Sequence, residues 1–178
     1  MIRPSPRSLH TSDGTLYRVR PIDADDAAAE RAFIMNLSPQ SRYQRLMYTI
    51  IEPSPAFVAQ LCHIDGHRNM ALVALSGAGA HESIIAIARY AADDNGLDCE
   101  FAVAVADAWQ CRGIGATLTK LLFEHATREG FRSIYGDILA DNPRMLALAE
   151  WLGLTVETVV EGQTTVRASR RLGPSQSQ

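Results

Sequence analysis

The chain has 178 residues, of which 47% are hydrophobic and 21% are charged, and its formal net charge is -3. This length suits one domain with a full hydrophobic core, and the composition is typical of a globular protein rather than a disordered or fibrous one. The slightly acidic balance disfavours general nucleic-acid binding, which needs a basic stripe or patch.

No apolar run approaches the roughly 20 residues needed to cross a bilayer, and the first residues do not form a secretory signal. We therefore expect no membrane partner and a cytoplasmic location. The three cysteines, an odd number, have no metal-like spacing. His63 and His67 lie close to Cys62, but nothing else in the chain completes a ligand set, so we expect solvated loop residues and no metal.

The elements in chain order begin after a polar, aperiodic stretch, residues 1–12, which we expect to be a flexible tail. Alternating polarity over Leu16–Arg20 predicts the first strand. Asp23 suits the N-cap of a helix, and the proline of Ser38-Pro39 suits the first position of another. We therefore predict two helices and then a shorter helix or pair of turns, over residues 23–36, 38–48 and 53–62.

The second half of the chain alternates strands with helices. Apolar runs predict a hairpin of two strands and then a third strand, over residues 70–75, 83–90 and 99–105. A helix from Ile114 should end at Gly130, and the strand after it, 133–139, should return parallel to 99–105. Asn142-Pro143 begins the last helix, and an antiparallel pair follows, over residues 155–160 and 163–170 with its turn at 161–162.

The predicted order is therefore β-α-α-β-β-β-α-β-α-β-β, an α/β fold with a mixed sheet and one parallel crossover. We expect a single domain over residues 13–171 and a second flexible tail over 172–178. There are no repeats and no internal linker.

The most informative stretch leads from the strand at 99–105 into the helix at Ile114. It reads Gln110-Cys111-Arg112-Gly113-Ile114-Gly115, and its glycines let the backbone come close to a ligand. The first turn of the helix has N–H groups without intrahelical partners, and Arg112 adds a cation with two parallel donors. A strand, a glycine-containing turn and a helix N-terminus together form an anion-binding arrangement that suits a pyrophosphate.

Other interpretations of Gly113-Ile114-Gly115 are weighed against this one. A tight strand-to-helix turn without a ligand stays open on spacing alone. A dinucleotide site is disfavoured because the G-x-G-x-x-G frame lacks its third glycine and the chain has only one βαβ unit. A Walker-type phosphate loop is excluded because no Gly-Lys-Ser/Thr follows.

The loop is accompanied by further motifs in a fixed order. These are Arg20-Pro21-Ile22 with Asp26, Leu37-Ser38-Pro39 with Ser41-Arg42, Glu100-Phe101-Ala102-Val103, and Asn142 with Met145. Together with the loop they resemble the GNAT superfamily of N-acyltransferases, and in particular the acyltransferase domain of bacterial protein lysine acetyltransferases, over roughly Tyr17 to Leu154. The resemblance implies a single GNAT-type α/β domain. Its sheet is mixed and mostly antiparallel, one parallel strand pair is splayed to admit acyl-CoA, and helices cover both faces.

The resemblance also implies acetyl-CoA as the co-substrate. In this family the thioester and the pantetheine arm lie along the strand backbone that corresponds to Val103, Ala104 and Val105, and the pyrophosphate lies on the loop. The remaining implied contacts are Gln110, Cys111, Arg112, Gly113, Ile114, Gly115, Ala116 and Thr117, with Asn142 and Met145 on the next helix. Asn142 is equally compatible with a plain N-cap.

Glu100 is the candidate general base. It shares one face of its strand with Asp98, whereas Phe101 and Val103 face the other way. A carboxylate in an apolar strand is costly unless it is exposed, paired or functional, so an edge-exposed or salt-bridged acid is the alternative. An alkylammonium of pKa about 10.4 must lose a proton before it can attack a thioester, and the resemblance gives that base role to a Glu at this position.

One position departs from the family pattern. Many members place a Tyr in the helix after the Asn, where it protonates the leaving thiolate. This chain has Ala149 at that position, and no Tyr follows Tyr135. We therefore assign no general acid.

The expected function is acetyl transfer from acetyl-CoA to a primary amine, with a protein lysine as the favoured acceptor on the resemblance alone. Two alternatives stay open: acetylation of a small-molecule amine, and a non-catalytic CoA-binding sensor module. The acyl chain length and the oligomeric state, a homodimer included, are not indicated by the sequence.

Overall fold

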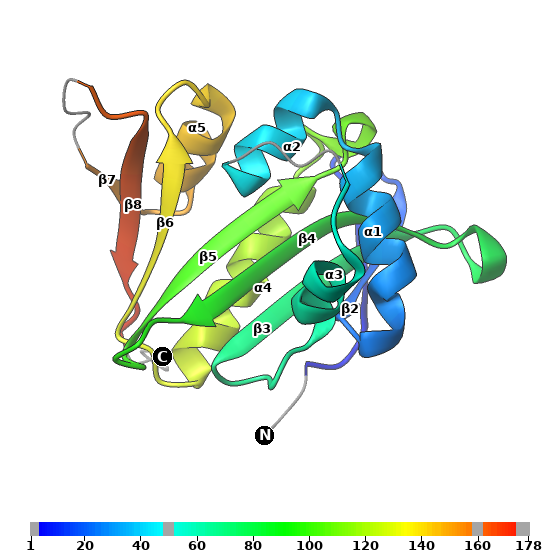
Figure 1. Cartoon of the computed structure of the whole chain (residues 1–178), viewed down its shortest axis with the longest axis horizontal. Coiled ribbons are helices and arrows are strands. Elements are labelled where there is room, and N and C mark those ends of the chain that lie inside the picture. Colours follow the sequence, from blue (N-terminus) through cyan, green and yellow to red (C-terminus); the bar gives the residue numbers. More distant parts are fainter. Residues whose placement is uncertain (1–3, 48–51, 158–161, 174–178) are drawn as a thin grey trace.

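The computed structural model of the protein describes residues 4–47, 52–157 and 162–173. Its centre is one eight-stranded sheet in the order β1-β2-β3-β4-β5-β6-β8-β7, antiparallel except for the β5–β6 pair (Figure 1). The strands are Arg7–His10 (β1), Leu16–Pro21 (β2), Asn69–Ser76 (β3), Ser83–Ala92 (β4), Asp98–Val105 (β5), Ser133–Leu139 (β6), Thr155–Val156 (β7) and Thr165–Arg171 (β8). The helices are Ala27–Asn36 (α1), Pro39–Leu46 (α2), Pro55–Cys62 (α3), Ile114–Arg128 (α4) and Pro143–Trp151 (α5).

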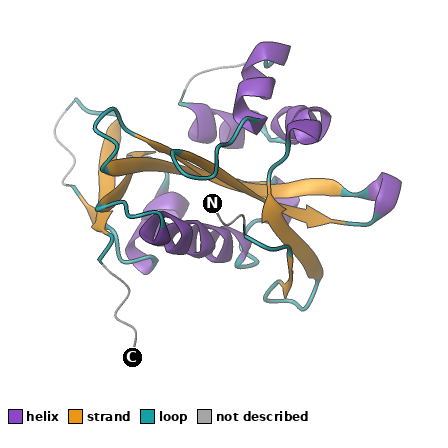
Figure 2. Cartoon of the chain, turned by 90° about the horizontal axis from the view of Figure 1, so that it is seen from below, coloured by secondary structure: helices purple, strands orange, loops and turns teal. Residues whose placement is uncertain are grey.

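Helices cover both faces of the sheet, as Figure 2 shows. On one face α1 and α3 pack on the central strands around Ile22, Phe33 and Val73. On the other face α4 lies across β3, β4 and β5, with Leu118 and Leu122 fully buried. The α/β fold with a mixed, mostly antiparallel sheet, one parallel pair and helices on both faces is therefore confirmed.

Local capping explains where the helices begin. Ser38 accepts a hydrogen bond from the backbone N–H of Ser41, and a proline follows it at the first position of α2. Asn142 does the same for Met145 at the start of α5. Asp23 caps a short 3-10 turn, Ala24–Asp26, that leads into α1. Each cap satisfies an N–H group that the helix itself leaves without a partner.

The predicted N-terminal tail, residues 1–12, differs from the structure. Arg7–His10 forms the edge strand β1 and pairs antiparallel with β2, from Arg7 opposite Val19 to His10 opposite Leu16. Three polar residues and one leucine show no visible periodicity, and only the adjacent strand gives them their partners. Predictions for residues 1–3, 48, 158–161 and 174–178 lie outside the described residues.

The parallel pair is splayed. β5 and β6 are in register only from Asp98 opposite Ser133 to Glu100 opposite Tyr135, and the two strands diverge beyond that point. Gly136 marks the divergence: a Cβ there would lie 3.0 Å from the carbonyl oxygen of Phe101. Only glycine lets the strands approach this closely before they separate.

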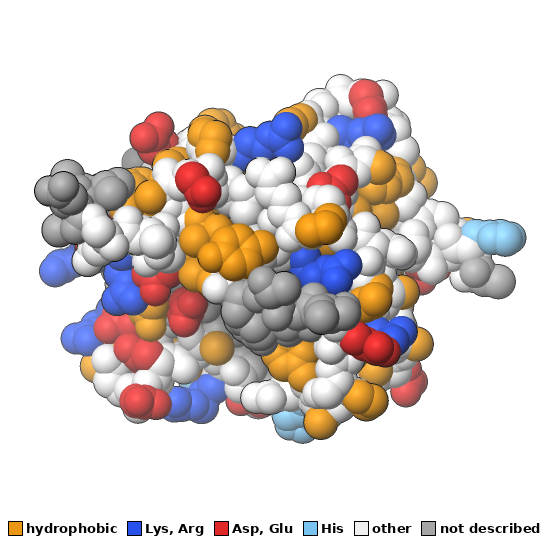
Figure 3. All heavy atoms as spheres, turned by 45° about the horizontal axis from the view of Figure 1, so that its top comes forward, with side chains coloured by type: hydrophobic (Ala, Val, Ile, Leu, Met, Phe, Trp, Pro, Cys, Tyr) orange, Lys and Arg blue, Asp and Glu red, His pale blue; other side chains and the backbone are white. Residues whose placement is uncertain are grey.

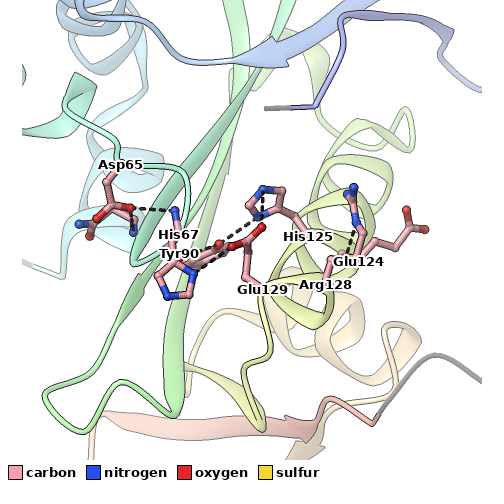
Figure 4. Close-up of polar contacts among 8 residues, drawn as sticks. Asp65, His67, Tyr90, Glu124, His125, Arg128 and Glu129 are labelled. Atoms are coloured by element: carbon pink, nitrogen blue, oxygen red, sulfur yellow. Dashed lines mark hydrogen bonds and ion pairs between the residues drawn. The ribbon is translucent and has the colours of Figure 1, made fainter. Parts of the chain in front are cut away.

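The C-terminal end of α4 is anchored to the loop before β3 (Figure 4). Buried His125 has its Nδ1 2.9 Å from the hydroxyl of Tyr90, which donates to the carbonyl of His67. The His67 imidazole lies 2.9 Å from the carboxylate of Glu129. This network holds α4 against the sheet at the end opposite to its N-terminus. Of the helices described, none combines the length and the apolarity needed to span a bilayer.

Candidate functional site

A cavity of about 170 Å³ opens where β5 and β6 separate. Its walls come from four segments: the C-terminal end of α2, the middle of β5, the second half of β6 and the first turn of α5. The lining includes four of the predicted site residues, namely Glu100, Val103, Asn142 and Met145.

Glu100 lies exposed at this cavity, beside the last paired residues of β5 and β6. Its strand neighbours are Ala91 on β4 and Tyr135 on β6. In the described part of the chain its carboxylate has no hydrogen bond or ion pair. The salt-bridged alternative therefore does not apply to the structure, and Glu100 has its acceptor oxygens available at the mouth of the cavity.

The strand backbone beyond Glu100 runs along the cavity toward the loop. Val105 ends β5, and its carbonyl oxygen accepts a hydrogen bond of 3.1 Å from Nε2 of Gln110. On its other edge the segment is paired with β4, with Ala104 opposite Ile87. Because β6 has diverged, an extended ligand can lie beside this stretch of strand.

The loop between β5 and α4 adopts a backbone suited to an anion. Cys111 and Gly113 have positive φ angles of 60° and 83°, and Gly113 is the N-cap of α4. A Cβ at position 115 would lie 3.2 Å from Cγ2 of Val105, so Gly115 keeps the first turn of α4 close to β5. Left-handed residues next to a helix N-terminus are the backbone arrangement found in anion-binding sites.

Gln110 holds the loop in place. Its Nε2 also donates to the hydroxyl of Ser41 on α2 at 3.2 Å, and its Oε1 accepts from Arg144 on α5 at 2.7 Å. The side chain predicted as a ligand contact therefore connects three elements around the cavity. Two of its partners, Arg144 and Ser41, lie 34 and 69 residues away in the chain, so the sequence pattern could not reveal them.

Arg112 is paired with an acid that sequence reasoning missed. Its Nη1 lies 3.3 Å from Oδ2 of Asp13, and its guanidinium stacks over the ring of Trp109 at 5.1 Å from the centroid. Hydrogen bonds from the hydroxyls of Thr11 and Thr15 hold the pKa of Asp13 below its usual range. Asp13 is therefore an anion at ordinary pH and lies beside the cation of the loop.

Asp107 joins α2 to the same loop. Its carboxylate accepts from the backbone N–H and the hydroxyl of Ser38, each at 2.9 Å, and from the hydroxyl of Ser41 at 2.7 Å. Burial alone would raise the pKa of this carboxyl, but these hydrogen bonds lower it. In the sequence, the position of Asp107 directly after a strand was the one signal of a functional role. Its partners on α2 could not be predicted from the sequence.

Asn142 caps α5, as the simpler interpretation predicts. Its Oδ1 accepts from the backbone N–H of Met145 at 3.1 Å. Both residues also line the cavity, so the capping role and a ligand contact are compatible. Ala149, one turn further along α5, is fully buried in the core.

Asp137 is the second carboxylate at the cavity, and it is paired. Nε and Nη2 of Arg167 donate to its two oxygens at 2.9 and 3.0 Å. The same guanidinium lies over the ring of Tyr135, 4.5 Å from its centroid. Sequence reasoning missed this cluster, because Arg167 lies on β8, 30 residues further along the chain.

Charged side chains of both signs are intermingled on the molecular face shown in Figure 3. That face has no continuous basic stripe of the kind that binds nucleic acid. Of the predicted loop histidines, His67 is in contact with Glu129 rather than with Cys62. Among the residues described, no group of three His, Cys, Asp or Glu side chains is placed to hold a metal ion.

Comparison with known sequences finds clear relatives. The model of the Acetyltransferase (GNAT) family matches residues 34–154. The acetyltransferase PA5475 of Pseudomonas aeruginosa is 38% identical over 154 residues, which cover 86% of this chain and 83% of that protein.

Comparison with solved structures agrees. The GNAT domain of S. lividans PAT is 26% identical and matches with a TM-score of 0.85 over 96% of this chain and all of that one. The putative acetyltransferase yncA from Salmonella typhimurium, solved with its cofactor acetyl-CoA, is 20% identical and matches with a TM-score of 0.65. That match covers 90% of this chain and 96% of that one, and it is a likeness of fold.

Proposed function

The chain belongs to the GNAT family of acetyltransferases, and from this we propose that it transfers the acetyl group of acetyl-CoA to the side-chain amine of a protein lysine. Glu100 is the general base in this proposal. The sequence resemblance to bacterial protein lysine acetyltransferases supports the choice of acceptor. The acetyl-CoA in the related Salmonella structure supports the choice of donor.

The described residues fit acetyl-CoA. The α4 N-terminus at Gly113 and the guanidinium of Arg112 suit a pyrophosphate. The stretch of β5 that β6 leaves unpaired suits the extended pantetheine arm, and the cavity beside Val103 is where the thioester would reach. Acetyl-CoA brings an activated acyl group, and this chain supplies the binding surface and the base.

The observation that carries the proposal is the unpaired carboxylate of Glu100 at that cavity. A lysine ammonium is almost fully protonated at neutral pH, because its ordinary pKa is about 10.4. Glu100 accepts one proton from it, directly or through one water, and the neutral amine can then attack the thioester carbonyl. Asp137 is less suited to this role because Arg167 occupies both of its oxygens.

Access to Glu100 supports a macromolecular acceptor. We call the side of β5, β6 and β8 that carries Glu100, Tyr135 and Asp137 the acceptor face. Figure 1 shows α1 and α3 over the neighbouring strands, while the C-terminal end of α2 forms one wall of the cavity. The Glu100 side chain is exposed at the mouth of this cavity. A lysine on a protein surface needs such an open approach, whereas a free amine does not.

Two other functions are compatible with the same fold. A small-molecule amine could use the same base and the same thioester. A non-catalytic sensor module would bind acetyl-CoA through the α4 N-terminus without using Glu100. Neither has an observation of its own in its favour, whereas Glu100 is exposed at the cavity and has no hydrogen bond or ion pair among the described residues.

An acceptor screen tests the proposal. The purified chain is incubated with radiolabelled acetyl-CoA and either lysate proteins or a panel of small amines, and label transfer is measured. We expect label on protein lysines, with mass spectrometry identifying the modified side chains. Label on small amines alone would replace the protein acceptor by a small one. Binding of acetyl-CoA without any label transfer would favour the sensor function.

A further inference from the structure

The Arg167 guanidinium fills a cation site on the acceptor face. It is bound by two parallel hydrogen bonds to Asp137 and lies over the ring of Tyr135. A carboxylate and an aromatic face are the groups that recognise alkylammonium and guanidinium ions. The cluster therefore has the chemistry of a binding site for a cationic side chain, and a residue of the chain itself occupies it.

This cation site adjoins Glu100. Tyr135 is directly opposite Glu100 across the β5–β6 pair, and Asp137 follows two residues later on β6. Because side chains alternate along a strand, Tyr135 and Asp137 share one face of the sheet. Burial, followed by the negative charge of Glu100, raises the pKa of the Tyr135 phenol, which agrees with this proximity.

The distance between the carboxylates of Glu100 and Asp137 determines which acceptors could contact both of them. Asp137 is the diagonal neighbour of Glu100 across the β5–β6 pair, and diagonal neighbours on adjacent strands are roughly 7–8 Å apart. Two residues of an extended peptide span roughly 6.6 Å. A peptide with cations at alternate positions, or a diamine of five carbons, could therefore contact both carboxylates if Arg167 were absent.

We propose that Arg167 determines acceptor specificity by filling this second cation site, so that the cavity accepts a single ammonium group, at Glu100. The inference rests on the proposed function. It limits the acceptors to amines in which the group that would lie next to Asp137 is uncharged. Without Arg167, the Asp137 carboxylate and the Tyr135 ring would be open to a second cation. Acceptors with two cationic groups would then gain an extra contact.

A purely structural cross-strand pair is the alternative. The side chains of Arg167 and Asp137 are 46% and 35% exposed. Exposed ion pairs contribute little to stability, so the pair is not needed for folding. The effect of replacing Arg167 should therefore be seen in acceptor preference rather than in the stability of the domain.

The test compares pentylamine with 1,5-diaminopentane, and a peptide with Ala-Lys-Ala-Ala against one with Ala-Lys-Ala-Arg, as acceptors for acetyl-CoA. In Arg167→Gln we expect kcat/KM for the dicationic acceptor to rise about fivefold relative to its monocationic partner, as one additional exposed ion pair allows. The change should lie mainly in KM. Arg167→Lys keeps the cation and should keep the wild-type ratio.

Two further variants make the outcome decisive. Arg132→Gln removes an arginine paired with a different aspartate, 3.7 Å from Asp98 at the start of β5, and should leave the ratio unchanged. Adding Asp137→Asn to Arg167→Gln should restore the wild-type ratio, because the second site is then destroyed. An unchanged ratio in a folded, active Arg167→Gln would overturn this inference alone. Absence of turnover of every amine by the wild type would overturn the proposed function and the inference with it.

Discussion

The guanidinium of Arg112 lies 3.3 Å from the carboxylate of Asp13, beside the loop that leads into α4. The backbone N–H of Ser12 also donates to the carbonyl of Arg112 at 3.1 Å, so the segment before β2 is attached to this loop. An internal anion thus lies next to the cation that we propose for the pyrophosphate of acetyl-CoA. The pair suggests that Asp13 and the pyrophosphate compete for Arg112.

The first prediction follows from that competition. Asp13→Asn should lower the Kd for acetyl-CoA about threefold at low ionic strength, because one exposed charge is removed near the anion site. The gain should shrink in high salt, where exposed charges are screened. Isothermal titration calorimetry at two salt concentrations measures this, with the exposed Asp25→Asn as control. A weaker affinity in Asp13→Asn would mean that Asp13 positions Arg112 rather than competing for it.

The second prediction concerns Arg112 itself. Arg112→Glu places a negative charge at the loop and should raise the Kd for acetyl-CoA at least about tenfold, since a favourable contact becomes a repulsive one. Circular dichroism should show an unchanged fold, because Arg112 is partly exposed. If the variant binds acetyl-CoA as tightly as the wild type, the proposed pyrophosphate site is wrong.

The third prediction tests whether Glu100 is the general base. Glu100→Gln keeps the shape of the side chain but cannot accept a proton, so the rate should fall about 10²–10⁴-fold. The Kd for acetyl-CoA should hardly change. Steady-state kinetics with the best acceptor, together with binding titrations, measure both, and Asp94→Asn in the exposed turn before β5 is the matched control. Full activity in Glu100→Gln would assign the base elsewhere.

The fourth prediction concerns the point where β5 and β6 separate. In Gly136→Ala the new Cβ would lie 2.9 Å from the Phe101 ring and 3.0 Å from its backbone oxygen. The backbone cannot yield easily, so the free energy of unfolding should fall by about 1–3 kcal/mol. Urea denaturation measures the loss. Gly173→Ala, with no atom within 4 Å of its new Cβ, should have no such effect.

The fifth prediction is a pH dependence of stability. Burial lowers the pKa of His125 below its ordinary value of 6.5, although the nearby Glu129 opposes the change. Below about pH 6.5 the unfolded chain therefore binds a proton that folded His125 does not, and the folded state loses stability as the pH falls. One such group contributes a slope of at most about 1.4 kcal/mol per pH unit.

Replacing this histidine tests the assignment. His125→Gln should flatten the dependence of the unfolding free energy on pH between 7 and 5, whatever its effect at neutral pH. His81→Gln, at an exposed histidine, should leave the slope as it is. An unchanged slope in His125→Gln would show that other groups cause the acid sensitivity.

The helix starts at Ser38 and Asn142 were predictable because a cap and its partner N–H lie three residues apart. The strand, loop and helix around Gly113 were also predictable, because the hydrophobic periodicity changes from that of a strand to that of a helix within a few residues. Edge strand β1 was not predictable, because its four residues have no pattern of their own and acquire order only beside β2.

The sequence by itself determined the family, the α/β order of elements, and Glu100 and the α4 loop as the residues to examine. These depend on neighbours in the chain, whose spacing sets hydrogen bonding and periodicity directly. Only the tertiary structure decided which side chains are already occupied. Gln110 is hydrogen-bonded to α2 and α5, and Asp137 is paired with Arg167. Glu100 has no such partner among the described residues. Such pairings join residues tens of positions apart, and only the packing of the sheet brings those residues within hydrogen-bonding distance.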